Sequence, residues 1–413
     1  MAIEEREIGI NDVAIGMFIC RLDRPWTETP FPLQGFLVRD IEQLRVLREF
    51  CARVWIDVHR SRPDTGMTLL RLERTGGVPA RPPAPPRPLH DAPRVTYTDT
   101  ATLDEERPAA AAAIDDARRI GKRLIDDLHA GQPVVPEDVR AAAEPIVASV
   151  LRNADALFWV NALRAHDPYS YSHAINCSSL AAAFGRHLGL PRDLLVRVAC
   201  GALLFDIGKT RVPEEIIGRA GPLNPLEMAR ARRHVELGLQ ILDESGETDA
   251  IVREMMAGHH ERFDGSGYPG RLRDGMIPVY ARIAGIVDSF DAMTSERPYA
   301  PALPRHDALQ ELYRGRDTLY HGELVEQFIS CLGVYPTGSL VELNTGEVAV
   351  VMAQNPSRRL RPRIMLLTYA GKRMRESFRT VDLMDQPLDT PRLEIRRPVA
   401  PGDYDIDLTG LYL

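Results

Sequence analysis

The stretch LLFDIGK, residues 203–209, places a carboxylate directly after an apolar run. Asp206 follows Val198 and Ala202 at helical spacing, which predicts that its side chain lies on the buried face of a helix. A buried carboxylate costs free energy unless a cation or hydrogen-bond donors compensate its charge. Lys209, one helical turn further on, is one candidate for that cation, and a bound metal ion is the other.

Histidines and a second acid occupy similar apolar helical stretches around this motif. Taken singly, a histidine on such a stretch is usually a hydrogen-bonded core residue, and such an aspartate is often a helix cap. Together, four imidazoles and two carboxylates on buried faces suit two divalent metal ions that share a bridging carboxylate. The six candidate ligands are His173, Asp206, His234, His259, His260 and Asp288.

A glycine-rich loop, DGSGYPG at 264–270, follows the histidine pair at 259–260. Glycine lets the backbone come close to a flat base or a phosphate, so the loop is a candidate substrate-binding element. A simple turn is the alternative explanation.

The overall composition excludes several classes of protein. A net charge of −7 over 413 residues argues against a dedicated DNA-binding protein, which would carry a basic face. The five cysteines form no C-x-x-C pair, so they indicate neither a disulfide framework nor a zinc knuckle. The start, MAIEEREIGI, lacks the apolar segment of a signal peptide, and no run approaches the roughly 18 apolar residues of a membrane span. We therefore expect a cytoplasmic protein without a membrane span.

Short strand-like patterns flank a long helical region. Near the N-terminus, VAIGMFICRL and VWIDV predict strands on either side of a helix, IEQLRVLREF. Near the C-terminus, GSLVELNTGEVAVVMAQN alternates around an Asn-Thr-Gly turn and predicts a hairpin, and RPRIMLLTY predicts a further strand. The proline-rich stretch VPARPPAPPRPLHDAP, residues 78–93, predicts a stiff, extended spacer.

The expected fold class is mainly α, with a helical central domain between a small α+β module and a small β module. The helical pattern that begins at about residue 109 predicts either a helix packed on its own domain or one that links two copies in a homodimer. The expected segments are the α+β module at 1–62, a linker at 63–108, linking helices at 109–150, the helical domain at 151–336, and the β module with an acidic tail at 337–413.

In this order, these residues resemble the HD-GYP family of cyclic di-GMP phosphodiesterases, a branch of the HD phosphohydrolases. The resemblance covers about 167–335 and rests on FDIGK, HHERFDGSGYP, IPVYARIAGIVDSFDAMTSERPY and GRDTLYHGELVEQF. It implies a helical fold with a centre of two iron or manganese ions. It also implies hydrolysis of the bacterial second messenger cyclic di-GMP to pGpG, and in some members to GMP, with signalling proteins as further partners.

The resemblance also implies roles for individual residues. Asp206 would bridge the two metals, with His234, His259 and His260 completing one of them. His173 and Asp288 would hold the other. Catalysis would rest on Asp206 and on Lys209, which would lie near the scissile phosphate. The residues implied to contact substrate are Lys209, Gly267, Tyr268, Pro269 and Arg297.

Several positions depart from the family's pattern. Phe205 stands where the family has the histidine of its HD motif, so one metal lacks an imidazole ligand. His166 is a less favoured replacement, because a helix is expected to start just after it. Tyr169 stands where some members have a glutamate that supports a third metal, so at most two are expected. Ala300 stands where others have a lysine or arginine, which predicts a weaker grip on phosphate.

Three functions therefore remain open at this point. The first is a phosphodiesterase with a weakened metal site. The second is a degenerate module that binds cyclic di-GMP or a signalling partner without hydrolysing it, which Phe205 and Ala300 favour. The third is a phosphohydrolase for another cyclic dinucleotide.

Overall fold

The computed structural model describes residues 5–23, 36–38, 41–57, 61, 94–163, 169–219, 221–296, 302–355, 358–386, 391–400 and 402–406. Within the chain it forms two compact units, residues 1–89 and 90–413. Several positions singled out above lie outside the described residues, and these are the spacer at 78–93, His166, Arg297 and Ala300.

The first unit is a small α+β module, as the sequence predicts. Its four-stranded antiparallel sheet has the order β1-β4-β2-β3. Met17, Ile19, Leu47, Val54 and Ile56 are buried between the sheet and its helix, because alternate strand residues and one helix face are apolar. The elements are β1 (Glu5–Gly9), η1 (Ile10–Asp12), β2 (Phe18–Leu22), β3 (Phe36–Leu37), α1 (Ile41–Phe50) and β4 (Arg53–Asp57).

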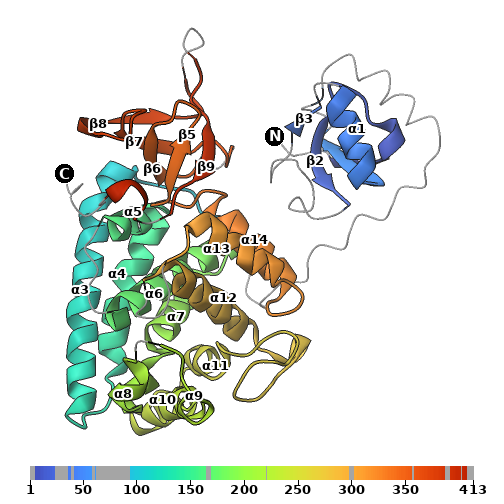
Figure 1. Ribbon diagram of the computed structural model, residues 1–413. Coiled ribbons are helices and arrows are strands. Elements are labelled where there is room, and N and C mark those ends of the chain that lie inside the picture. Colours follow the sequence, from blue (N-terminus) through green and yellow to red (C-terminus); the bar gives the residue numbers. More distant parts are fainter. Residues whose placement is uncertain are drawn as a thin grey trace. The chain divides into compact units, whose positions relative to one another are not determined.

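The second unit is mostly helical (Figure 1). Its first helices are α3 (Leu103–His129), α4 (Pro136–Arg152), α5 (Ala156–Ala162), α6 (Tyr169–Leu188) and α7 (Arg192–Leu204). The middle of the unit contains η4 (Ile207–Arg211), α8 (Glu214–Ile217), α9 (Pro225–Arg232), α10 (His234–Glu244) and α11 (Ala250–Gly258). The last are η5 (Asp274–Met276), α12 (Val279–Thr294), α13 (Arg305–Arg314) and α14 (Gly322–Leu332).

Three of these helices form the centre of the domain. Helix α6 packs on α7 and α12, and α4 packs on both α6 and α7. Phe184 of α6 and Phe290 of α12 are both buried against Phe328 of α14. None of the described helices is both long enough and apolar enough to cross a bilayer. The packed helices of this unit agree with the predicted mainly α fold.

The first long helix begins earlier than the expected start at about residue 109. Helix α3 starts at Leu103, because Thr102 and Glu105 form a capping box in which each side chain bonds the backbone amide of the other residue. Residues 103–108, placed in the linker by the sequence, are thus helical, and Pro108 is accommodated near the helix start. Helix α3 lies along α4 on one side of the unit (Figure 1).

The C-terminal module is a five-stranded antiparallel sheet with the order β8-β7-β6-β5-β9. The predicted hairpin and the third strand are confirmed. The expected tail is wrong in part, since Ile395–Pro398 forms β9, which pairs with β5 at the sheet edge. The strands are β5 (Leu340–Leu343), β6 (Val348–Ala353), β7 (Arg363–Thr368), β8 (Met374–Asp382) and β9, followed by η6 (Asp403–Asp405).

A partly buried carboxylate joins this module to the helical domain. Asp155, just before α5, accepts hydrogen bonds from the Thr337 hydroxyl at 2.6 Å and from the backbone N–H of Gln354 at 2.9 Å. Burial raises the pKa of Asp155, while these two donors favour its charged form. The sheet is therefore attached to the helices by polar contacts as well as by apolar packing.

Candidate metal centre

The carboxylate of Asp206 lies among the six predicted ligands. The sequence placed it within a helix, but α7 ends at Leu204 and Asp206 occupies the turn before η4. That turn directs its two oxygens at different groups of side chains. The ligand atoms of Asp206, His234, His259 and His260 all lie within 4.8 Å of one another, and so do those of His173, Asp206 and Asp288.

In the first group, which contains His234 and His259, imidazole lone pairs point at one oxygen of Asp206. His234 Nδ1 lies 2.8 Å from the Ala231 carbonyl oxygen, and His259 Nδ1 lies 2.9 Å from that of Met256. A carbonyl only accepts, so both Nδ1 atoms carry the proton and both Nε2 atoms present a lone pair. These Nε2 atoms lie 3.4 Å and 3.6 Å from Asp206 Oδ1 and 3.4 Å from each other.

A cation fits this arrangement. Asp206 Oδ1 is buried and has no hydrogen-bond partner among the described residues. Two imidazole lone pairs and a carboxylate oxygen repel one another unless a positive charge lies between them. Burial lowers the pKa of His234 to about 4, so this imidazole is neutral at physiological pH, as metal coordination requires. The residues present therefore fit a divalent metal ion.

The second group is formed around the other oxygen of Asp206. His173 Nε2 lies 3.4 Å from Asp206 Oδ2 and 3.3 Å from Asp288 Oδ1. Lys209 Nζ donates a hydrogen bond to the same Oδ2. Burial opposes ionisation of Asp206, but Lys209 and the surrounding imidazoles hold the pKa of its carboxyl well below the usual range. Asp206 is thus ionised, and each of its oxygens faces one ligand group.

Asp291 is a buried member of this site that sequence reasoning missed. Its Oδ2 lies 2.7 Å from His173 Nδ1, so the carboxylate orients the ring and leaves Nε2 directed at Asp206 and Asp288. The available signal was spacing, because Asp291 follows Asp288 by three residues and lies on the same face of α12. Burial works against a charged His173, yet its neighbours, Cys177 and the three carboxylates, raise its pKa well above the usual value.

Phe205 lies against both ligand groups. Its side chain is fully buried, and its ring stacks on that of His259 with centroids 4.7 Å apart. It also meets the ring of His173 edge-on, with centroids 6.0 Å apart. A phenyl ring offers no lone pair, so this wall of the site contributes packing and no ligand.

Gly208 allows two backbone segments to touch behind Asp206. A Cβ atom at this position would lie 1.9 Å from the carbonyl oxygen of His234 and 2.4 Å from the amide nitrogen of Gly238. Only glycine permits so close an approach. The contact holds η4 against α10 and thereby brings Asp206 and His234 together.

We expect Gly208→Ala to lower the free energy of unfolding by about 2–3 kcal/mol, because the clashing atoms belong to the backbone and cannot rotate away. Urea denaturation would measure the change. Gly275→Ala is the matched control, since a Cβ at that position meets nothing within 4 Å. Equal stability of the two variants would show that η4 and α10 do not pack this closely.

The loop at 264–270 is tied to the histidine pair. Glu261 is buried, and its carboxylate accepts hydrogen bonds from the amides of Gly270 at 2.6 Å and Leu272 at 2.9 Å. The Tyr268 amide donates to the His260 carbonyl at 3.1 Å, and the Tyr268 ring stacks on that of His260 with centroids 4.5 Å apart. A Cβ on Gly267 would lie 2.5 Å from the same carbonyl, so this glycine is needed for close approach. The loop at 264–270 and the candidate metal ligand His260 therefore form one packed unit.

Replacing Glu261 with glutamine should loosen this loop. The side-chain amide of glutamine has one oxygen and one NH₂ group, so one of the two backbone N–H groups would face a donor instead of an acceptor. The lost hydrogen bond should cost about 1–3 kcal/mol. We expect faster hydrogen exchange of the Gly270 and Leu272 amides in Glu261→Gln, with unchanged metal content. Glu244→Gln, which changes an exposed acid bonded to Arg211, is the control. Unchanged exchange in Glu261→Gln would exclude this role.

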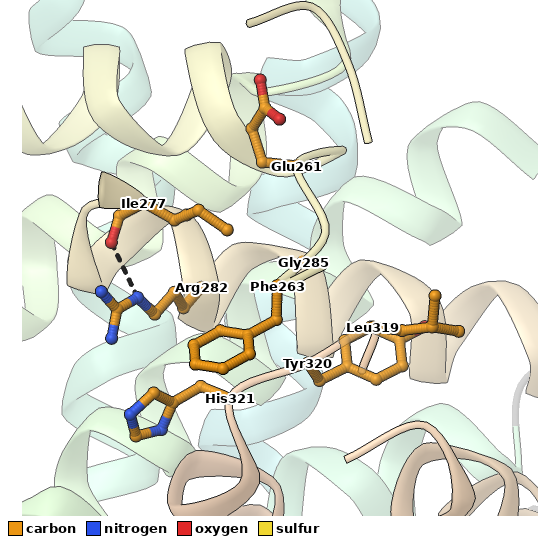
Figure 2. Close-up of a pocket in the computed structure, with 8 residues that line it drawn as sticks. All are labelled: Glu261, Phe263, Ile277, Arg282, Gly285, Leu319, Tyr320 and His321. Carbon is orange, nitrogen blue, oxygen red and sulfur yellow. Dashed lines mark hydrogen bonds between the residues drawn. The ribbon is translucent and has the colours of Figure 1, made fainter. Parts of the chain in front are cut away.

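A small cavity lies beside Glu261 and Phe263 (Figure 2). Glu261, Phe263, Arg282 and His321 are among its lining residues, and Arg282 Nε donates to the Ile277 carbonyl at 2.7 Å. Its volume of about 10 Å³ holds one water molecule at most. A nucleotide therefore cannot bind in this cavity.

The predicted substrate residues are only partly described. The structure brings Lys209, Gly267 and Tyr268 close to the ligand groups. Pro269 follows Tyr268 through a cis peptide bond and is exposed. Arg297 lies outside the described residues.

Known families match three stretches of the chain. Residues 159–324 match the HD domain, which includes all six candidate ligands. Residues 340–404 match a KOW domain associated with HD domains, and residues 5–139 match a domain of unknown function. The last of these matches spans the first unit and extends into α3 and α4 of the second.

Comparison with curated proteins extends these matches. The chain is 31% identical to a cyclic di-GMP phosphodiesterase of Pseudomonas aeruginosa over 92% of its own length and 89% of the relative's. A cyclic di-GMP phosphodiesterase of Thermotoga maritima is 34% identical over 40% of this chain and 45% of that protein. A 3′3′-cGAMP-specific phosphodiesterase of Vibrio cholerae is 33% identical over 40% of this chain and 32% of the relative. With a full-length relative, an HD domain match and the HHERFDGSGYP segment packed around its ligand groups, this chain belongs to the HD-GYP family of HD phosphohydrolases.

Proposed function

We propose that this chain hydrolyses cyclic di-GMP to pGpG at a centre of two divalent metal ions. The observation that supports this most directly is the position of Asp206, whose two oxygens face two separate groups of ligand atoms. A shared carboxylate of this kind suits a pair of metals that act on one phosphodiester. The near full-length similarity to a relative named as a cyclic di-GMP phosphodiesterase supports the choice of substrate.

The proposed ligand assignment divides the six residues between two metals. Asp206, His234, His259 and His260 would hold one, and His173, Asp288 and the other oxygen of Asp206 would hold the second. Imidazole nitrogens suit borderline metals, and carboxylate oxygens suit harder ones, so iron and manganese are the proposed ions. With Phe205 in place of a ligand, the second group is the weaker of the two.

The residues around the metals would each have a separate task. When bound, the metal pair supplies a nucleophilic hydroxide at neutral pH and neutralises charge on the phosphoryl oxygens. Lys209, which contacts Asp206, would direct its ammonium group toward the scissile phosphate. On metal binding His173 would give up one proton, and Asp291 would hold it in the tautomer that presents Nε2 to the metal. Tyr268 would form one wall for the nucleotide.

We further propose that the catalytic domain spans residues 151–336, as the sequence indicates. The match to the HD domain at 159–324 and the end of α14 at Leu332 support these limits. The first unit and the C-terminal sheet would then be accessory modules.

Turnover assays with defined metals test this function. Protein stripped of metal and reloaded with Mn²⁺, or with Fe²⁺ under anaerobic conditions, should open cyclic di-GMP to pGpG, and the metal-free protein should not. The linear 3′3′-cGAMP product should be assayed in parallel, because relatives specific for that dinucleotide also match the chain. Binding of cyclic di-GMP without turnover at any metal concentration would support the binding module in place of the enzyme. Preferred cleavage of 3′3′-cGAMP would change the substrate.

A further inference from the structure

Arg232 is a cation that the metal centre does not use. It is the last residue of α9, two positions before the candidate ligand His234, and its side chain is exposed. Its guanidinium carbon lies 4.8 Å from the centre of the Tyr268 ring. That ring stacks in turn on His260, so Tyr268 connects Arg232 to a candidate ligand. Tyr268 therefore places the guanidinium group of Arg232 beside a candidate ligand.

Three other arginines in the described part of the chain have partners of their own. Arg262 donates to the carbonyl oxygens of His259 and Glu261, so its charge supports the backbone of the histidine pair. Arg219 pairs with Glu227, and Arg233 lies 3.8 Å from Glu236. In the described part of the chain, Arg232 has the Tyr268 ring as its contact and no carboxylate within ion-pair distance.

The chemistry of the substrate supplies a partner for this charge. Cyclic di-GMP carries two phosphodiesters, and a two-metal centre neutralises the one that is cleaved. The second remains anionic and needs a cation a few ångströms further along the ring of the dinucleotide. A guanidinium group suits this task because its planar fork binds phosphate oxygens in pairs. A cation–π contact at an exposed site is weak, so Arg232 can turn from Tyr268 to a phosphate at little cost.

We propose that Arg232 binds the non-scissile phosphate of the cyclic dinucleotide, with Tyr268 holding its side chain ready at the edge of the metal centre. The proposal rests on the proposed function and adds a specificity residue to it. Because the contact is made equally in the ground state and the transition state, Arg232 contributes to substrate affinity and leaves the chemical step unchanged.

The test compares two substrates that differ in the second phosphate. For cyclic di-GMP, Arg232→Ala should raise KM roughly tenfold to hundredfold, the loss expected for one charge-assisted hydrogen-bonded contact, with kcat unchanged. Bis(p-nitrophenyl) phosphate carries a single phosphodiester, so its hydrolysis by the same variant should match that of the wild type. Arg232→Lys should restore part of the affinity through its charge. Arg233→Ala is the matched control, since it removes the neighbouring exposed arginine.

The outcomes separate this proposal from the proposed function. An unchanged KM in Arg232→Ala, or an equal loss with both substrates, would overturn the role of Arg232, the second because it would indicate a damaged metal centre. If the wild type binds cyclic di-GMP without cleaving it, the proposed function fails. In that case calorimetry would measure the dissociation constant of cyclic di-GMP for the same variants. An unchanged constant in Arg232→Ala would then overturn the role of Arg232. A wild type that neither binds nor cleaves cyclic di-GMP would overturn both.

Discussion

His259→Ala is expected to lose at least one of two bound metal equivalents and most of the turnover of cyclic di-GMP. The imidazole is fully buried, its Nδ1 is held by the Met256 carbonyl, and its Nε2 lies 3.6 Å from Asp206 Oδ1. Loss of groups that merely orient a ligand already costs about 10–100-fold in metal affinity, so loss of a ligand should cost at least as much. Phe205, whose ring stacks on that of His259, offers no lone pair that could replace the lost imidazole.

Metal analysis after reconstitution with Mn²⁺ would measure this loss directly. His260→Ala should behave in the same way, because its ligand atom lies within the same group. His187→Ala is the control, since this exposed histidine bonds Gln327. Full metal occupancy in both His259→Ala and His260→Ala would rule out the ligand assignment.

Phe205→His is expected to strengthen metal binding. The imidazole ring of the variant would lie between His173 and His259. It would place a nitrogen donor beside the carboxylate of Asp206, which already faces both ligand groups. We expect a gain of roughly tenfold or more in affinity, about 1.4 kcal/mol or more, in the group formed by His173, Asp206 and Asp288. Turnover at low metal should rise, and the difference should shrink as metal saturates.

Packing provides a second measure of the same substitution. A smaller, polar ring in this fully buried position should cost about 1–3 kcal/mol without metal, and Mn²⁺ should recover the loss. Phe184→His is the matched control. Phe184 is equally buried but packs on Phe328, so its replacement should destabilise the protein with and without Mn²⁺ alike. If Phe205→His behaves as this control does and gains no metal, position 205 does not face the metal centre.

The sequence alone was sufficient for the helical fold and for the identity of the candidate ligands. Buried helical stripes have a regular period, so His173 and Asp288 stand out as polar residues on apolar faces. The hairpin at 340–353 was also predictable, because its Asn-Thr-Gly turn and its alternation are local signals. The pair Thr102 and Glu105 was a local signal for the earlier start of α3. The composition of the expected linker obscured this signal.

Other features depend on residues far apart in the chain, and only the tertiary structure decided them. Strand β9 forms because β5 offers an open edge, a partner that the local pattern of 395–398 does not reveal. The pairing of Asp291 with His173 joins positions separated by more than a hundred residues, and the contact of Gly208 with α10 depends on how two backbones cross. Composition and spacing determine which residues are buried, but the direction of each lone pair follows from backbone carbonyls such as that of Met256. For this reason the sequence predicted the candidate ligands, whereas the convergence of His234 and His259 on one oxygen of Asp206 required the packed fold.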